Sequence, residues 1–259
     1  MEQLDCTIPI CGIPVNNFPD SSKALEAIEE LALRNALEVP VQVNFINAHV
    51  VNCALADPET LAILNESNLN IEDGVGVWLG GVILSGTDMV NLNGTDFGLE
   101  LLRWGAAKGL KFYFLGAKEG IAEEAKEKLC TRIPGLRVVG THNGYLDQTI
   151  SQDVVHQVLD AGTDILFVCM GVPSQEKWVH DHRPMLKGVK ATFGLGAFFD
   201  FYADAVKRAP LWMRKLRMEW IYRLYKEPRR LWKRYLLGNI IFLWHVFTCL
   251  ASRGFGNEK

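Results

Sequence analysis

Two hydrophobic patterns alternate along the first 203 residues. Short, continuously apolar segments predict buried strands, and longer segments with apolar residues at helical spacing separate them. The predicted strands are 8–15, 41–46, 70–73, 110–115, 136–141, 164–170 and 189–194. The predicted helices are 21–35, 76–85, 94–108, 119–132, 150–159 and 197–203, with two more that begin at Asp57-Pro58 and at Pro173. This alternation predicts an α/β fold, a Rossmann-like and mostly parallel sheet with helices on both faces.

After Ala203 the alternation stops and the pattern becomes helical. We predict one helix over 210–226 and a second from Pro228, because Glu227-Pro228 interrupts the helix. The apolar run over 235–251 is shorter than the roughly 20 residues of a membrane-spanning helix, which favours an interfacial helix. We therefore divide the chain into an α/β core, 1–204, and a helical, membrane-associating appendage, 205–259.

The appendage concentrates the positive charge of an otherwise acidic protein. Between residues 205 and 235 there are eleven Lys and Arg and two Glu, interleaved with Trp and Tyr, whereas the whole chain has 27 basic and 30 acidic residues. Such a segment favours an anionic and partly apolar partner: a phospholipid surface, a polyphosphate or a nucleic acid. The acidic remainder and the apolar tail disfavour nucleic acid.

The composition, 49% hydrophobic and 22% charged, is that of an ordinary globular protein. The six cysteines include no C-x-x-C pair, so we expect free thiols in a reducing cytosol. The N-terminal segment carries Glu2 and Asp5 and lacks a basic region, so we expect no signal peptide.

Polar residues follow several predicted strands at their carboxyl ends, which is where open parallel sheets bind ligands. They are Asn47, Asp73, Gly116 and the segment 171–177. Asp73 is a candidate general base, although its local sequence favours a turn or a helix cap. Thr95 and Asp96 begin a predicted helix, where capping is the simpler role.

No complete cofactor motif accompanies these residues. Gly116 and Gly120 form only G-x-x-x-G, and the segment 194–199 begins as G-x-G but has Phe where the third glycine belongs. The sequence also lacks an Asp-x-Asp pair, the usual carboxylate grip on a metal–diphosphate. We therefore expect neither a metal nor a cofactor. An NAD(P)-dependent sugar-modifying enzyme is an alternative that these incomplete glycine patterns disfavour.

The arginines of the appendage are candidates for binding a diphosphate. Arg223, Arg230 and either Lys233 or Arg234 share one helix face if Pro228 only kinks the path. A face of guanidinium groups matches diphosphate oxygens in bidentate fashion. A solvated basic face is the alternative, and the interleaved aromatic residues disfavour it.

Seven short motifs make the chain recognisable. They are DGVG at 73–76, GTD at 94–96, GVPSQEKW at 171–178, GLGAFFD at 194–200, RAP at 208–210, EWIYRL at 219–224 and EPRR at 227–230. With these motifs the chain resembles the WecG/TagA/CpsF glycosyltransferase family over about residues 10–235. The tail over 235–247 is similar to the branch of the family that makes exopolysaccharide repeat units.

The resemblance implies an inverting glycosyltransferase on the cytoplasmic face of the membrane. Members of the family move a hexose or N-acetylhexosamine-type sugar from a UDP-sugar donor to a lipid-linked diphosphate glycan acceptor, and they do so without a bound metal. It also implies a Rossmann-like core whose appendage touches an anionic membrane surface and closes the site.

The resemblance further implies roles for particular residues. Asp73 matches the proposed catalytic base, and Asn47 matches a site asparagine. Gln175 matches a site glutamine, with Glu176 and Lys177 beside it. The arginines thought to engage diphosphate match Arg223 and Arg230, and we expect substrate contacts also from Thr95, Asp96, Gly116, Gly171 and Arg229.

This sequence departs from the family's pattern at several positions. Phe45 replaces a threonine found in part of the family and His49 replaces a glutamate, so the resemblance does not extend to the identity of the sugar. A third appendage arginine falls near Lys233 and Arg234. Asp204 stands where glycine is common.

Two other classes of protein remain open at this stage. One is a non-catalytic, membrane-peripheral module that binds nucleotide sugars, and UDP release in the presence of lipid acceptor would separate it from an enzyme. The other is the NAD(P)-dependent enzyme, which NAD(P) would protect against thermal unfolding. A homo-oligomer is also possible, and nucleic acid is not expected as a partner.

Overall fold

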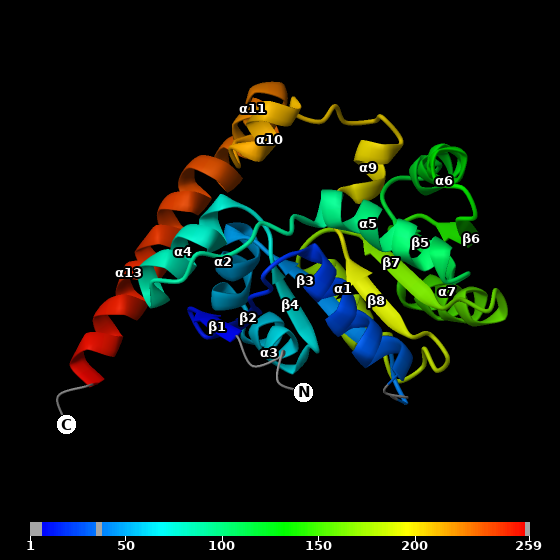
Figure 1. Ribbon diagram of the computed structural model, residues 1–259, viewed down its shortest axis with the longest axis horizontal. Coiled ribbons are helices and arrows are strands. Elements are labelled where there is room, and N and C mark those ends of the chain that lie inside the picture. Colours follow the sequence, from blue (N-terminus) through cyan, green and yellow to red (C-terminus); the bar gives the residue numbers. More distant parts are fainter. Residues whose placement is uncertain (1–6, 35–37, 257–259) are drawn as a thin grey trace.

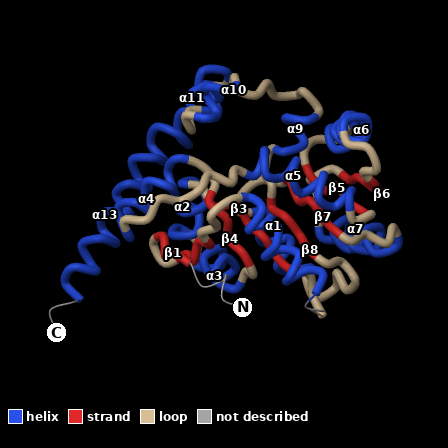
Figure 2. The backbone as a smooth tube through the Cα atoms, viewed as in Figure 1, coloured by secondary structure: helices blue, strands red, loops and turns tan. Residues whose placement is uncertain are grey.

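The computed structural model describes residues 7–34 and 38–256. Within them eight strands form one sheet in the order β1-β2-β4-β3-β8-β7-β5-β6, shown in Figures 1 and 2. Neighbouring strands are parallel except for the β1–β2 hairpin at the edge. The strands are β1 (Thr7–Ile10), β2 (Ile13–Asn16), β3 (Val41–Ile46), β4 (Leu69–Glu72), β5 (Lys111–Gly116), β6 (Arg137–His142), β7 (Ile165–Cys169) and β8 (Ala191–Gly194). The predicted mostly parallel α/β fold is confirmed.

Helices cover both faces of the sheet because successive strand residues point to opposite sides. In β5, Phe112 and Phe114 enter the core under one set of helices, while Tyr113 and Leu115 enter the core on the other face. The first set is α1 (Ser21–Glu29), with its π-helical extension η1 (Glu30–Arg34), α5 (Gly94–Ala107), α6 (Ile121–Arg132) and α9 (Phe198–Tyr202). The opposite face carries α2 (Ala48–Ala56), α3 (Pro58–Glu66), α4 (Val75–Ser85), α7 (Gln148–Asp160) and α8 (Ser174–His182).

The structure differs from the predicted elements in three places. The predicted strand 8–15 is a hairpin, turned by Cys11 and Gly12 at positive φ. Helix α2 was not predicted. The predicted helix 210–226 is two helices, α10 (Leu211–Lys215) and α11 (Glu219–Lys226), because Arg217 between them is left-handed with φ of 59°.

The C-terminal helix is longer than the sequence pattern predicted. After the break at Glu227, the helical segments α12 (Pro228–Trp232), η2 (Lys233–Leu237) and α13 (Gly238–Gly256) follow one another without interruption. The stretch Pro228–Ser252 has 25 residues, and a window of 18 residues within it has a mean hydropathy of 1.5, which by length and composition is enough to cross a membrane. The helix is thus longer than the apolar run 235–251, because neither Gly238 nor Asn239 ends it, and the preference for an interfacial helix stays a prediction.

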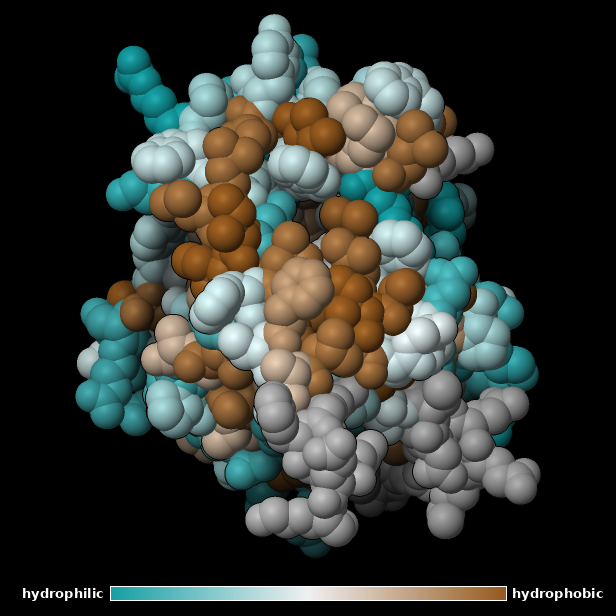
Figure 3. All heavy atoms as spheres, turned by 90° about the vertical axis from the view of Figure 1, so that its left-hand side faces the viewer, coloured by the Kyte–Doolittle hydropathy of each residue, from teal (hydrophilic) through white to brown (hydrophobic). Residues whose placement is uncertain are grey.

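One side of α13 belongs to the protein core. Phe242 and Val246 are 1% and 0% exposed, and they pack against α2 and α4. Gly80 of α4 permits this approach, since a Cβ there would lie 3.1 Å from the Phe242 ring. The opposite side exposes a row of large apolar side chains, which gather on the face shown in Figure 3: Leu236, Leu237, Ile240, Ile241, Trp244, Phe247 and Leu250.

This packing predicts that Phe242→Ala destabilises the protein by about 3–5 kcal/mol, the usual cost of truncating a buried phenylalanine. Chemical unfolding in mild detergent, followed by circular dichroism, measures the effect. Phe247→Ala is the matched control on the same helix, because Phe247 is 55% exposed and little contact is lost. Equal destabilisation by both variants would show that α13 does not pack as described.

Candidate active site

Two adjoining pockets lie beyond the carboxyl ends of the central strands. The appendage pocket lies between the starts of α2 and α4 and the helices α10, α11 and η2. The loop pocket lies over the loops that follow β5, β7 and β8. Six residues line both pockets and therefore mark their junction: Asn47, Asp73, Thr95, Phe201, Arg223 and Arg234.

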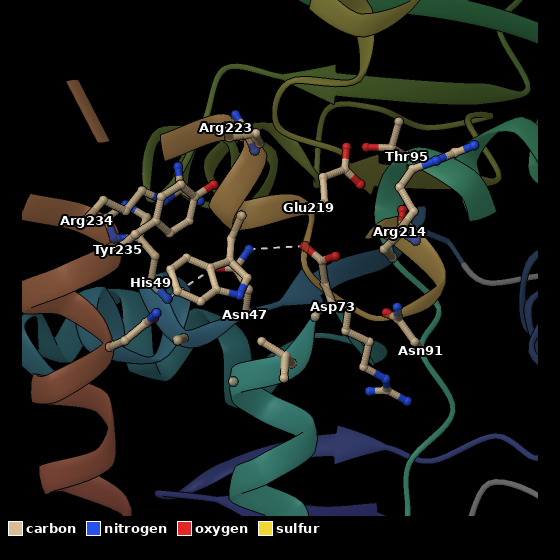
Figure 4. Close-up of a pocket in the computed structure, with 18 of the residues that line it drawn as sticks. Asn47, His49, Asp73, Asn91, Thr95, Arg214, Glu219, Arg223, Arg234 and Tyr235 are labelled. Atoms are coloured by element: carbon tan, nitrogen blue, oxygen red, sulfur yellow. Dashed lines mark hydrogen bonds between the residues drawn. The ribbon is translucent and has the colours of Figure 1, made fainter. Parts of the chain in front are cut away.

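Asp73 and Asn47 meet at this junction because they follow neighbouring parallel strands, in which Ile46 pairs with Glu72. The Nδ2 atom of Asn47 donates a hydrogen bond to Oδ2 of Asp73 at 3.1 Å, drawn as a dashed line in Figure 4. Asn47 Oδ1 caps α2 by accepting from the backbone N–H groups of His49 and Val50. The asparagine is thereby fixed, and it holds the Asp73 carboxylate toward the pockets.

Burial raises the pKa of Asp73 above its usual range, and the charge of Glu219 raises it further. The hydrogen bond from Asn47 and the charge of Arg234 oppose this change. A carboxylate with a raised pKa accepts a proton more readily than an ordinary aspartate. This is what a general base near neutral pH requires.

Glu72, the residue before Asp73, points away from the pockets into the protein. Burial raises its pKa to about 8, and the nearby charge of Arg217 acts in the opposite direction. Arg217 Nη1 lies 3.4 Å from Glu72 Oε1, and its Nη2 donates to the Met89 carbonyl at 2.9 Å. Arg217 also lies over the Trp78 ring at 5.0 Å. These contacts fix the turn between α10 and α11 to the core.

Positive side chains line the junction. Arg223 lies over the ring of Phe201 at 5.3 Å, and burial lowers the pKa of Arg234. The Nε atoms of Arg223 and Arg234 are buried and have no hydrogen-bond partner among the described residues. The loop pocket adds Lys118 and Arg230. Unpaired guanidinium donors of this kind suit an anionic ligand such as a diphosphate.

Gln175 organises the glycine loops of the loop pocket. Its buried Oε1 accepts from the backbone N–H of Gly171 at 3.2 Å and of Gly196 at 3.1 Å, which joins the loops after β7 and β8. Its Nε2 donates to Glu176 Oε1 at 2.8 Å. A Cβ at Gly194 would lie 2.8 Å from Gln175 Nε2, so a larger residue there would displace the Gln175 amide.

The structure brings some of the predicted site residues together and leaves others outside. Asn47, Asp73, Thr95, Gly171, Gln175, Arg223 and Arg230 line one or both of the pockets. Glu176 is buried behind Gln175, where burial raises its pKa to about 7. Gly116 lies below the loop pocket against Cys169, at φ of 139°.

Three further predicted residues also lie outside both pockets. Lys177 forms ion pairs with Asp57, at 2.8 Å, and with Glu59. Asp96 binds Arg208 at 2.6 Å and Arg214 at 2.8 Å, so it joins α5 to the appendage. Arg229 is exposed on α12 and lines neither pocket.

Several lining residues did not stand out in the sequence as site residues. Glu219, Trp220 and Tyr235 reach the appendage pocket from the appendage, and Asn91 and Asn93 reach it from the loop before α5. Of the two basic candidates near 233, Arg234 lines the pockets. His49 also lines the appendage pocket, where burial and the charge of Arg234 lower its pKa to about 4, so its imidazole is neutral at pH 7.

Among the described residues, no group of three or more His, Cys, Asp and Glu side chains could hold a metal ion. The charged side chains of the two pockets are the central carboxylate of Asp73, that of Glu219 in the appendage pocket, that of Asp200 in the loop pocket, Lys118, and several arginines. This arrangement can deprotonate a hydroxyl group beside a bound anion.

Comparison with known proteins places the chain in a family. The model of the Glycosyl transferase WecG/TagA/CpsF family matches residues 8–254. The chain is 32% identical, over 86% of both chains, to the N-acetylglucosaminyldiphosphoundecaprenol N-acetyl-beta-D-mannosaminyltransferase of Bacillus subtilis (strain 168). It is 31% identical to the protein of the same name from Staphylococcus aureus (strain MRSA252), over 73% of this chain and 71% of that one. The predicted resemblance is thus confirmed, and this chain is a glycosyltransferase that belongs to the WecG/TagA/CpsF family.

Proposed function

We propose that this enzyme transfers a hexose-type sugar from a UDP-sugar to a glycan carried on a polyprenyl diphosphate, with inversion and without a metal ion. Bacterial surface polysaccharide synthesis is the process it would serve. The acceptor follows from the names of the relatives, which describe a sugar on diphosphoundecaprenol. The single observation that supports the proposal most is the position of Asp73, at the junction of two pockets and close to the charges of Arg223 and Arg234.

In this proposal the two pockets have different ligands. The loop pocket, with its glycine loops, Lys118 and Arg230, holds the UDP part of the donor. The appendage pocket holds the acceptor sugar. Asp73 takes the proton of the acceptor hydroxyl as its oxygen bonds to C1 of the donor, and the C1–O bond to UDP breaks on the opposite face. One displacement of this kind inverts the anomeric centre.

The departing UDP carries negative charge on its β-phosphate, and this charge must be stabilised. Arg223 and Arg234, at the junction, supply positive charge where a metal ion would supply it in other enzymes. Both belong to the appendage, 205–259, and Asp73 belongs to the core, 1–204. We therefore assign the chemistry to the contact between these two parts of the chain.

The appendage also suggests where the enzyme works. Phe242 and Val246, in the middle of α13, pack on the core, so lipid cannot surround this helix. Its exposed apolar side can enter the membrane interface, with basic residues of the appendage near the headgroups. We assign the enzyme to the cytoplasmic face of the membrane, where UDP-sugars and the diphosphate of a lipid-linked acceptor are both within reach.

The test is UDP release from a panel of UDP-sugars, each mixed with N-acetylglucosamine on a polyprenyl diphosphate. We expect release from one UDP-sugar, dependent on acceptor and insensitive to EDTA, with a product of inverted anomeric configuration by NMR. A retained configuration or loss of activity in EDTA would contradict the mechanism. Absence of release from every pair would favour the binding module. Thermal protection by NAD(P) would favour the NAD(P)-dependent sugar-modifying enzyme.

A further inference from the structure

Glu219 places a second carboxylate in the appendage pocket. It is the first residue of α11 and lies one helical turn before Arg223, so the two side chains share a face of that helix. It lines the appendage pocket but not the loop pocket. Figure 4 shows it on the appendage side of the pocket, across from Asn47 and Asp73.

The two oxygens of Glu219 have different surroundings. Oε2 accepts a hydrogen bond from Arg208 Nη2 at 3.3 Å. Oε1 is buried, and no donor among the described residues reaches it. A buried acceptor without a partner is costly, so such atoms in native structures usually bind something. Because Glu219 lines the appendage pocket, the partner that we infer for this atom is a ligand bound there.

A cluster of ion pairs holds Glu219 in this position. Arg208 pairs with both Glu219 and Asp96, and Arg214 pairs with the same Asp96 oxygen as Arg208. Arg208 also lies over the Phe201 ring at 5.6 Å. The carboxylate is therefore anchored through one oxygen, and the other is held in a defined place without a partner among the described residues.

The charge of Glu219 determines which ligand group it can bind. A carboxylate accepts hydrogen bonds and repels anions, so it cannot contact the diphosphate of either substrate. Sugar hydroxyl and acetamido N–H groups are donors without charge. Because Glu219 lines only the appendage pocket, the hydrogen-bonding hydroxyl or N–H group that contacts it belongs to the acceptor sugar.

We propose that Glu219 binds the acceptor: its free Oε1 accepts a hydrogen bond from a hydroxyl or acetamido N–H of the acceptor sugar and turns the attacking hydroxyl toward Asp73. This inference rests on the proposed function and adds a specificity-determining residue to it. The acceptor sugar is then held between a carboxylate from the appendage and one from the core.

Glu219→Gln is the principal test, because it keeps the size of the side chain and an oxygen for Arg208. We expect the KM for the lipid-linked acceptor to rise about 10- to 100-fold, the range for losing a hydrogen bond to a charged group, with the KM for the UDP-sugar unchanged. Acceptors that each lack one donor group identify the partner. With the wild type, the acceptor that lacks the group bound by Glu219 should react more weakly than the complete acceptor. With Glu219→Gln, these two acceptors should react equally well, because the hydrogen bond is already lost.

The pH profile gives a second readout. The titratable and charged groups that line the two pockets around Asp73 are His49, Lys118, Asp200, Arg214, Arg217, Glu219, Arg223, Arg230 and Arg234, and Glu72 lies behind it. Since the negative charge of Glu219 raises the pKa of Asp73, its removal lowers that pKa. The acid limb of kcat/KM should therefore move to lower pH in Glu219→Gln. In Glu219→Asp, which keeps the charge but shortens the reach, the limb should stay while the acceptor KM still rises.

Asp96→Asn is the matched control for a merely structural role, because it loosens the same ion-pair cluster from a residue outside both pockets. An unchanged acceptor KM in both Glu219 variants would overturn the proposal. An equal rise of the acceptor KM and the UDP-sugar KM in the Glu219 variants would also overturn it, because that is the result expected when Asp96→Asn merely loosens the ion-pair cluster. If the wild type transfers sugar to no lipid-linked acceptor, the proposed function itself fails, and that outcome is distinct from the others.

Discussion

Replacing Asp73 with asparagine is expected to lower kcat by roughly 10²- to 10⁴-fold, the contribution of a general base, while the enzyme still binds UDP. Asparagine has nearly the same shape and can still meet Asn47, but it cannot accept the proton of the acceptor hydroxyl. Acceptor-dependent UDP release measures the loss, and calorimetric titration with UDP measures the retained binding. In the wild type, the raised pKa of Asp73 should place the acid limb of kcat/KM above the usual range of aspartate.

Asp153→Asn, at an exposed position of α7 that lines neither pocket, makes the same chemical change where no effect is expected. If Asp73→Asn keeps full turnover, another group must be the base. Glu219 would then be the first candidate, since it is the other carboxylate that lines the appendage pocket.

Arg223→Ala should cost about 10²- to 10³-fold in kcat, comparable to removing one group that stabilises developing negative charge. Arg223 lines both pockets, so it is placed to bind the diphosphate of the donor as it becomes the leaving group. The loss should be larger with donors whose leaving group is more basic. Single-turnover kinetics at saturating UDP-sugar separate this effect from weaker donor binding.

Lys226→Ala provides the control for Arg223, because it removes one positive charge from the same helix but from an exposed side chain outside the pockets. Equal losses in the two variants would mean that the general charge of the appendage matters, through membrane binding, and not the position of Arg223. Point variants are preferable to deletion of the appendage, since deletion would also uncover the surface that Phe242 and Val246 bury.

The strands were predictable because their sequence pattern has a simple physical origin. In β5 and β7 both faces are buried, so no position after Lys111 at the start of β5 is charged and each segment stands out. Helix α2 escaped prediction for a related reason. It lies between the sheet and α13, and its sequence, AHVVNCALA, therefore lacks the polar face that marks a surface helix. The turn at Arg217 could not be predicted from the sequence either, because a left-handed backbone conformation is usually marked by glycine and this position is an arginine.

Within the site, residues at strand ends were the most predictable part. Asn47 and Asp73 follow adjacent parallel strands, so their proximity follows from the topology alone. Lys177 was grouped with Gln175, but two residues along a helix turn the side chain by roughly 200°, and Lys177 consequently faces α3 and not the pocket. The contribution of Glu219 depends on how the appendage docks on the core. Arg208 binds both Glu219 and Asp96, and Asp96 is 112 positions away from Arg208, so no local sequence pattern encodes this contact.

The unbroken helix from Pro228 to Ser252 has a consequence for regulation. Arg234 occupies its first third and the exposed aromatic side chains of Trp244 and Phe247 occupy its second half. Phe242 and Val246 fix this helix to the core, so its exposed apolar side keeps a set orientation relative to Arg234 and Asp73. If that side enters the membrane interface as proposed, the angle at which lipids hold it also sets how the pockets face the lipid-linked acceptor, and the membrane would regulate turnover without a separate effector.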